Sequence, residues 1–417
     1  MAWPFTRSAP EKKDNPVGAA FMVPGGVTWQ RPANRRAFIE EGYQQNVVVY
    51  RAVREITTAM ADLVIEVHAN GEPIENHPAL ALLARPNPAQ GWDGFIKQAF
   101  TDYMLLGEMA IVTPNESGPP AELWAVNPIA VEVRPGPAGL PTAYCHKLNS
   151  REVVFPVDDD GSSQMFFMKM YNPSDYWRGQ SPLVAAGLCA DTHNAGVRWN
   201  YSLLKNSARP SGLIKLGEGA GKEVVERLRE WFKRAFQGET NAGEIPVLPA
   251  GAEWQAMDNN PRDMDFLNTQ KETAKLVASA FGVPLPLIDN DASTFNNLEQ
   301  AKERFYTDTI LPLFNEFLSQ FGNWLLKRYP GGDRLTFAVD MDAIGSLESL
   351  RGRKFGRMMQ AVAAGVLTVD EAREAIGYDA MGGASSVLDP VGSAIFNAQG
   401  DVTKSLKQAA ALAYGDK

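Results

Sequence analysis

The sequence from residue 276 to residue 300 is LVASAFGVPLPLIDNDASTFNNLEQ, and it separates two long helical patterns. Gly282 is typical of a helix end, and Pro284 and Pro286 prevent the helix predicted over residues 263–281 from continuing. The short polar segment 289–297 follows, and Phe295 lies in it without an obvious strand or helix to join. Because loops held by rigid elements commonly carry function, this segment is a candidate functional loop.

Long helices are predicted on both sides of that stretch. A helix over 298–329 contains Pro312, which predicts a kink because proline lacks the N–H of the helical ladder. A helix over 179–208 begins with Ser181 as a candidate N-cap and Pro182 at its first position. Between this helix and the one over 263–281, the pattern predicts a compact insert of roughly 45 residues. Its predicted elements are strands over 213–216, 245–248 and 253–257 and a helix over 222–236.

The sequence pattern of the N-terminal half predicts a small sheet backed by helices. Residues 1–45 contain many Pro and Gly residues with little periodicity, which is typical of an extended arm. We expect the acidic turn at 158–161 to close a hairpin between the strands on either side of it. The predicted helices cover 47–61, 79–84 and 92–106, and the predicted strands cover 63–68, 108–113, 122–126, 131–134, 144–147, 153–156 and 165–170.

The C-terminal part predicts a strand over 335–341 and helices over 347–364 and 369–376. Thr368 and Glu371 fit a capping box at the start of the last helix. Residues 381–417 are rich in Gly, Ser and Ala, which is typical of a flexible tail. Strands and helices together predict an α+β fold.

The composition limits the function. The chain has 417 residues, 45% of them hydrophobic and 21% charged, which is enough for two or three folded units. Forty Lys and Arg against 49 Asp and Glu give a net charge of −9, which argues against a protein that grips nucleic acid by neutralising phosphates. Cys145 and Cys189 fit a reducing compartment rather than a disulfide scaffold. We expect neither a signal peptide nor a membrane helix, because no apolar run reaches the roughly 18 residues that a membrane span needs.

The motifs of enzymes are incomplete. Residues 217–222, GEGAGK, resemble a phosphate loop but lack its first Gly and its Ser or Thr. Residues 179–183, GQSPL, lack the second Gly of a nucleophile elbow, and Pro182 removes an N–H that an oxyanion hole would use. The four histidines have no metal-ligand spacing, and an acidic hairpin turn alone is weak evidence for a cation. We therefore expect no catalytic residue, no metal and no cofactor.

One alternative stays open on the carboxylates Asp340 and Asp342. They are two residues apart in a predicted strand, so they share one face of it. A pair of carboxylates can perform general acid and base catalysis, which makes a soluble carboxylate-dependent hydrolase the alternative function.

Several short motifs occur in order between residues 45 and 380. They are His77-Pro78 with Leu82-Leu83 and Pro86-Asn87, the stretch 103–107, Gly179-Gln180-Ser181-Pro182-Leu183, Ala208-Arg209-Pro210-Ser211-Gly212, Phe281-Gly282-Val283-Pro284, and residues 293–300, STFNNLEQ. With these motifs, and with its order of long helix, insert, return helix, polar loop and kinked helix, the chain resembles the portal proteins of tailed bacteriophages. It is most similar to the smaller branch found in siphophages and prophages.

The resemblance implies a dodecameric ring at one vertex of a capsid, which conducts double-stranded DNA without sequence specificity during packaging and ejection and catalyses nothing. It implies the terminase large subunit, the major capsid protein and a head-tail adaptor protein as partners, and no membrane. The protein would be located in the virion, after assembly in the cytoplasm of a bacterial host. The implied parts are an extended arm over 1–45, a wing domain over 46–178, a stem helix over 179–209, a clip over 210–257, a second stem helix over 258–288, a tunnel loop over 289–297, a kinked helix over 298–330, a wing and crown region over 331–380 and a flexible tail over 381–417.

Two groups of residues are the interaction sites that the resemblance implies. The tunnel loop would line the channel with Asp289, Asn290, Asp291, Ser293, Thr294, Phe295, Asn296 and Asn297. Its acids repel phosphates, and its amides and hydroxyls offer hydrogen bonds that exchange easily. The clip would face partners with Lys222, Arg227, Lys233 and Arg234. The short C-terminal region implies a reduced crown, and the sequence leaves open whether the particle is a phage or a gene transfer agent.

Overall fold

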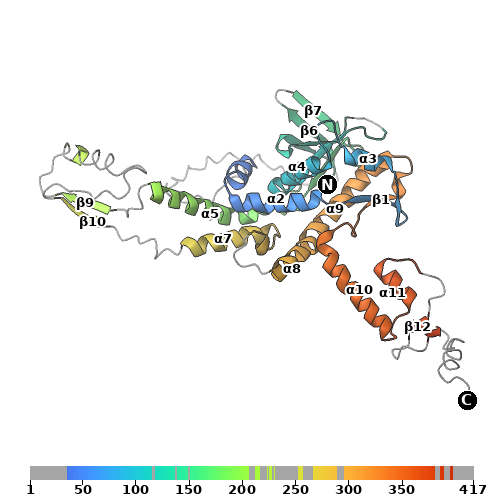
Figure 1. Ribbon diagram of the computed structural model, residues 1–417. Helices are drawn as coiled ribbons and strands as arrows, with labels where there is room; N and C mark the ends of the chain where they lie inside the picture. Colours follow the sequence, from blue (N-terminus) through green and yellow to red (C-terminus); the bar gives the residue numbers. More distant parts are fainter. Residues whose placement is uncertain are drawn as a thin grey trace, which may run out of the picture. The chain divides into compact units, whose positions relative to one another are not determined.

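The computed structural model describes residues 35–114, 118–136, 139–148, 151–205, 212–216, 223, 225–227, 230, 252–256, 266–288, 295–380, 386–388 and 395–397. The chain divides into two units, Met1–Asn34 and Arg35–Lys417, and every described residue belongs to the second. Helices and short antiparallel strands alternate along this unit (Figure 1). The predicted α+β class is therefore confirmed.

Three of the helices have the predicted bounds, α11 (Val369–Ile376) and two in the N-terminal half, because local signals mark their ends. Helix α2 (Val47–Ala61) starts at Asn46, whose side chain accepts hydrogen bonds from the N–H groups of Val48 and Val49. Helix α4 (Trp92–Leu106) ends at Gly107, which has the left-handed conformation (φ 72°) that glycine adopts without strain. Between them lie the strands β1 (Ile65–Ala69) and β2 (Glu72–Ile74) and the short helix α3 (Pro78–Ala84).

Short antiparallel sheets surround these helices. The strands of the N-terminal half are β3 (Glu108–Val112), β4 (Trp124–Val126), β5 (Val131–Pro135), β6 (Pro141–Leu148), β7 (Arg151–Pro156) and β8 (Met165–Lys169). They form two three-stranded sheets, ordered β4-β3-β8 and β5-β6-β7. A third sheet, β11-β1-β2, contains the distant strand β11 (Leu335–Val339), in register from Ile65 opposite Val339 to Ala69 opposite Leu335. The C-terminal part therefore completes a sheet that the N-terminal half begins.

Aromatic side chains fill the core between the helices and the sheets. Phe100 of α4 contacts Phe317 of the helix α9 (Leu311–Leu325), with ring centroids 5.2 Å apart. Phe317 stacks on Phe321 at 4.9 Å, and Phe166 of β8 packs edge-on against Phe321. All four of these side chains are buried, so the burial of large rings holds α4, α9 and β8 together.

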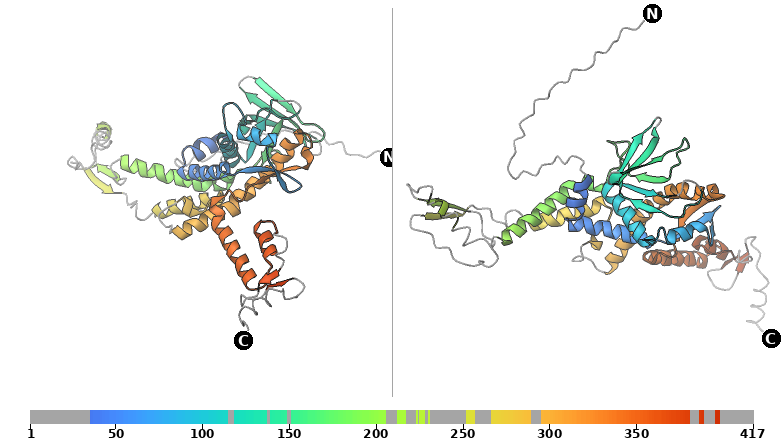
Figure 2. Two further views of the ribbon diagram at one scale, coloured as in Figure 1. Left: turned by 45° about the vertical axis from the view of Figure 1, so that its right-hand side comes forward. Right: turned by 90° about the horizontal axis from the view of Figure 1, so that it is seen from above.

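Helices α5 (Pro182–Lys205) and α7 (Phe266–Ala280) run side by side, as the views in Figures 1 and 2 both show. They are the two long helices that the sequence predicts around an insert. Of the insert, the structure describes the antiparallel pair β9 (Gly212–Leu216) and β10 (Ala252–Ala256) and the helical residues 223, 225–227 and 230. The predicted strand over 245–248 lies outside the described residues.

The predicted arm over 1–45 is wrong at its C-terminal end. Residues Arg35–Ala37 form a short helix, α1, and Phe38–Tyr43 continue it as a π-helix, η1. Phe38, Ile39 and Tyr43 pack against the hydrophobic core, and this burial explains why the segment is helical rather than extended.

The predicted tunnel loop is too long by three residues. Helix α8 (Phe295–Phe305) begins at Phe295, so Phe295, Asn296 and Asn297 are helical. Near Pro312, where the sequence predicts a kink, the helix widens into a π-helix, η7 (Tyr306–Ile310), directly before α9. Pro312 has no N–H for the carbonyl of Asp308, which accounts for the wider turn at this place.

Two further expectations are corrected. The acidic turn 158–161 closes no hairpin, because β7 pairs with β6 and β8 pairs with β3, so the turn connects two sheets. Strand β11 ends at Val339, so Asp340 and Asp342 lie after the strand instead of on one of its faces.

The C-terminal helices are α10 (Glu348–Ala363) and α11 (Val369–Ile376), and the capping box of Thr368 and Glu371 is confirmed. Two short strands, β12 (Ser386–Leu388) and β13 (Ile395–Asn397), pair in the region predicted to be a flexible tail.

Candidate functional site

The entry into helix α5 passes very close to the end of helix α4. A Cβ atom on Gly179 would lie 2.0 Å from the carbonyl oxygen of Gly107, and one on Gly107 would lie 2.5 Å from the carbonyl carbon of Gln180. No larger residue fits at either position without moving the backbone. The two glycines therefore allow the chain to cross from the sheet β4-β3-β8 into α5.

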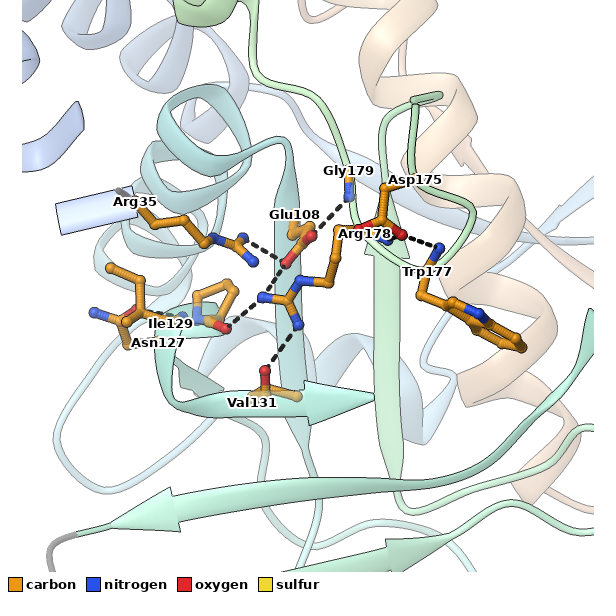
Figure 3. Close-up of polar contacts among 10 residues, drawn as sticks. Arg35, Glu108, Asn127, Ile129, Val131, Asp175, Trp177, Arg178 and Gly179 are labelled. Atoms are coloured by element: carbon orange, nitrogen blue, oxygen red, sulfur yellow. Dashed lines mark hydrogen bonds and ion pairs between the residues drawn. The ribbon is translucent and has the colours of Figure 1, made fainter. Parts of the chain in front are cut away.

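A buried carboxylate stands beside this crossing (Figure 3). Glu108, the first residue of β3, has no solvent exposure and accepts hydrogen bonds from the Arg35 guanidinium at 2.5 Å and from the Gly179 N–H at 2.6 Å. The Arg178 guanidinium lies 3.1 Å from the same carboxylate. One side chain thus joins helix α1, the sheet β4-β3-β8 and the start of α5.

Arg178 is held in place by the segments around it (Figure 3). The Asp175 carboxylate accepts hydrogen bonds from the backbone N–H groups of Trp177 and Arg178, which fixes the turn before α5. The Arg178 guanidinium donates to the carbonyl oxygens of Val131 and Pro128, at 2.9 and 3.3 Å. Arg178 therefore connects the β5-β6-β7 sheet to Glu108.

Burial has the largest effect on the pKa values of the two acids at this junction. Burial raises the pKa of the Glu108 carboxyl, while the Arg35 guanidinium and the Gly179 N–H act in the opposite direction. Burial also raises the pKa of Asp102, on α4, to about 7, and Arg35 again opposes the change. Arg35 is thus the cation that faces both acids.

Two side-chain hydrogen-bond systems anchor α5 to the rest of the unit. The Ser181 hydroxyl accepts from the Leu183 N–H and donates to the Met104 carbonyl, one of the last carbonyls of α4, which confirms the predicted N-cap. The Asn46 amide donates to the Ala190 carbonyl at 3.2 Å and to the Asn194 side-chain oxygen at 3.0 Å, both on α5. The Asn194 amide in turn donates to the Glu41 carbonyl.

The predicted tunnel loop lies mostly outside the described residues. Asp289, Asn290, Asp291, Ser293 and Thr294 are not among them, and for Phe295 and Asn296 the structure describes only a helical backbone. Asn297 is exposed on the first turn of α8. The structure therefore does not bring the predicted loop side chains together, and Asn297 alone can be placed.

A groove of about 880 Å³ lies where this loop leaves and rejoins the described chain. Gly282, Pro284 and Pro286 line one side of it, and Asn297, Ala301 and Arg304 line the other. Gly282 has φ 70°, and its carbonyl accepts a hydrogen bond of 2.7 Å from the Thr309 hydroxyl of η7. The end of α7 is thereby attached to the π-helical turn between α8 and α9.

The predicted clip residues are also only partly described. Arg227 is exposed and lies 3.8 Å from Glu223, one helical turn before it. Lys222, Lys233 and Arg234 lie outside the described residues.

Asp340 and Asp342, the two carboxylates of the alternative function, each have partners in the segment after β11. The Asp340 carboxylate accepts from the N–H groups of Asp342 and Ala343, and Asp342 pairs with Arg351 at 2.9 Å. In the described part of the chain, no three His, Cys, Asp or Glu side chains come together as metal ligands would. Nor does any helix in it combine the length and apolarity needed to cross a membrane.

The sequence profile of the phage portal protein family matches residues 47–377 of the chain. The chain belongs to the phage portal protein family. An uncharacterised Rickettsia bellii protein is 31% identical over 344 residues, which cover 81% of this chain and 88% of the relative. A probable portal protein of Streptomyces phage phiC31 is 26% identical over 217 residues, or 49% of this chain and 45% of that protein.

Solved structures agree with membership of the portal family. A chain in the neck of an empty gene transfer agent particle, computed with C6 symmetry, matches with a TM-score of 0.65 and 30% identity. A chain in the neck of the native particle, computed with C12 symmetry, matches with a TM-score of 0.64 and 29% identity. Each match covers 84% of this portal-family chain and 95% of the neck chain.

The residues that organise this portal-family fold were only partly visible in the sequence. Two predicted motifs, residues 103–107 and 179–183, meet at the junction, but Glu108, Arg35 and Arg178 were not among the predicted site residues. A signal existed for Glu108, because a carboxylate within the apolar stretch LLGEMAIV must find cations if it is buried. No signal identified the cations.

Proposed function

We propose that this portal-family protein forms a ring of twelve copies at one vertex of a capsid, through which double-stranded DNA enters and leaves a particle. The family match over residues 47–377 carries the proposal. The C12 symmetry of the native neck supports the number of copies. The net charge of −9 fits a conduit, because a chain with more acidic than basic residues repels the DNA backbone on average.

The particle that we propose is of the gene transfer agent type. The neck chains of the gene transfer agent match over 84% of the protein, at 30% and 29% identity. The proposed partners are the terminase large subunit, the major capsid protein and a head-tail adaptor protein. The exposed Arg227 fits a partner-facing clip built on residues 210–257. We place assembly of the ring in the bacterial cytoplasm.

Residues 289–297 are the proposed channel segment. They connect α7, one of the two long stem helices, to the kinked helix that starts with α8. Asn297, at the C-terminal end of the segment, lines the 880 Å³ groove and is exposed there, and Pro286, three residues before the segment, lines the groove as well. Asp289 and Asp291 would repel the DNA backbone, while Ser, Thr and Asn side chains form and break hydrogen bonds with it.

Electron microscopy of the purified full-length chain tests the ring. Class averages of negatively stained particles should show rings with a central hole, and native mass spectrometry should give the mass of about twelve copies. A closed dimer as the only assembly would contradict the proposal. The particle itself supplies the second test, because deletion of the gene in the producing cell should leave capsids without DNA.

The channel segment is tested with one matched pair of variants. Asn297→Lys adds a cation to every copy at the proposed channel, whereas Asn323→Lys adds the same cation at an exposed site on α9. Both variants should form rings. Asn297→Lys should reduce the amount of DNA packaged per particle and make packaging more dependent on salt, because phosphates are retained at the added cations. Equal packaging by the two variants would place Asn297 outside the channel.

A further inference from the structure

The hairpin of α10 and α11 exposes an apolar row. Gly352, Phe355 and Met359 follow one another at intervals of three and four residues, so they lie along one side of α10. Phe355 is 49% exposed and Met359 54% exposed, and Val366, in the turn between the helices, is 72% exposed. A row of this kind at one edge of a hairpin is typical of a surface that another chain covers.

Charge is separated between the two helices of the hairpin. Helix α10 carries Arg351, Arg353, Lys354 and Arg357 against a single acid, Glu348. Helix α11 carries Asp370, Glu371 and Glu374 against a single base, Arg373. A hairpin with one basic and one acidic helix presents opposite charges on its two sides, which is the arrangement that a head-to-tail ring requires.

Two of the basic side chains on α10 form ion pairs within the chain. Arg351 pairs with Asp342 at 2.9 Å, and Arg353 pairs with Glu303 of α8 at 2.5 Å. Arg357 is exposed and makes no ion pair or hydrogen bond with the described residues. Arg351 and Arg353 therefore attach α10 to the rest of the unit, and Arg357 is available to a partner.

The helical geometry places the available charges on opposite outer sides of the hairpin. Val362 is buried, and α10 packs on α11; Arg357, five positions earlier, lies about 140° around the helix from it. Ala372 of α11 is buried as well, and Glu374, two positions later, is about 160° away from it and exposed. Glu374 also makes no ion pair with the described residues.

We propose that this hairpin is an interface between neighbouring copies of the chain, in which the Arg357 side of α10 in one copy lies against the Glu374 side of α11 in the next. The contact closes the ring on the side of the C-terminal helices and covers Phe355 and Met359 at its edge. It rests on the proposed ring, and it names the surfaces that hold this part of the ring together. The partner is a second copy because opposite charges of one hairpin match from copy to copy around a ring.

Charge reversal and its rescue test the interface on the full-length chain. Mass photometry over a concentration series gives the concentration at which half of the chains are assembled. Arg357→Glu alone and Glu374→Lys alone should each raise this concentration about tenfold, since each places like charges in contact. The two changes together should return it to within about twofold of the wild type. In about 1 M salt the differences should shrink, because the charges are screened.

A second pair of changes tests the apolar edge. Phe355→Ser with Met359→Ser should also weaken assembly but leave the unfolding temperature of the unassembled chain unchanged, because both side chains are exposed in the single copy. The control is Arg85→Glu, which reverses an exposed cation far along the sequence in the wing and should assemble as the wild type does.

The outcomes separate this proposal from the proposed function. Wild-type rings together with unaffected single charge variants overturn the interface and leave the portal function standing. A double variant no better than either single change also overturns it, since specific pairing requires rescue. If the wild-type chain forms no ring at any concentration, and its particle contains no ring either, the proposed ring is overturned and the interface with it.

Discussion

Arg35 donates a hydrogen bond of 2.5 Å to the buried carboxylate of Glu108, 73 positions further along the chain. Arg178 approaches the same carboxylate from the turn before α5. A single acid thus pairs with two cations that come from different parts of the chain, at the point where the chain passes from the sheets into α5.

Replacing Glu108 by Gln should lower the free energy of unfolding by about 3–5 kcal/mol, because two largely buried guanidinium groups then lose their counter-charge. Urea denaturation of the wild type and the variant measures the change. The control is Glu152→Gln, which breaks an ion pair with Arg134 on the exposed sheet and should change stability by less than about 0.5 kcal/mol. Equal losses in the free energy of unfolding would mean that the buried network contributes no more than an exposed ion pair.

Gly179→Ala should destabilise the protein by at least about 2 kcal/mol, because its new methyl group would stand 2.0 Å from the Gly107 carbonyl oxygen and force the backbones apart. Gly187→Ala provides the matched control within α5. A Cβ there meets nothing within 4 Å, so alanine should stabilise the helix by about 0.5–1 kcal/mol. Thermal unfolding of both variants gives the comparison, and a neutral Gly179→Ala would show that the crossing has room.

Local signals in the sequence predicted much of this fold. The bounds of α2 and α4 follow from their apolar spacing, from Asn46 and from Gly107, and the capping box of Thr368 and Glu371 marks the start of α11. Each of these signals lies within a few residues of the feature that it fixes. Periodicity, caps and glycine ends are sufficient for such elements.

The features that were missed depend on distant partners. Helical structure at 35–43 depends on a core that Phe38 and Ile39 reach only in the folded chain. The strands beside the acidic turn 158–161 look like a hairpin locally, but β8 joins β3 instead of β7. The partners of Glu108 lie 70 or more positions away from it in the sequence. A single sequence contains no signal for such pairings.

Asn46 links α2 to α5, and this link can be tested. Its side-chain oxygen caps α2, and its amide donates to Ala190 and Asn194. Asn46→Ala removes both functions and should cost about 2–3 kcal/mol. Asn46→Asp keeps the cap but turns the donor into an acceptor that faces the Ala190 carbonyl, so it should also destabilise. A fully stable Asn46→Asp variant would show that only the cap matters.

Asp102 makes the protein's stability depend on pH. Its pKa in the folded chain is raised from 3.8 to about 7 by burial, so folding favours the protonated carboxyl. The stabilisation is fully present below about pH 4 and is lost as the pH rises through about 7. Asp102→Asn removes the titration, and the stability of this variant relative to the wild type should therefore increase from pH 4 to pH 7 and stay constant above.

Urea denaturation at pH 4.5, 6 and 7.5 measures this difference, which should grow by on the order of a few kcal/mol over the range. Asp93→Asn, at an exposed residue paired with Lys97 on the same helix, should show no comparable trend. The sign of the change in relative stability with pH shows whether burial or Arg35 has the larger effect on the pKa of Asp102. If Arg35 outweighed burial, the pKa of Asp102 would be lowered, and the wild type would instead gain stability relative to Asp102→Asn as the pH rises above its folded-state pKa. An increasing advantage of the Asn variant would show that burial dominates at the junction even with a guanidinium nearby.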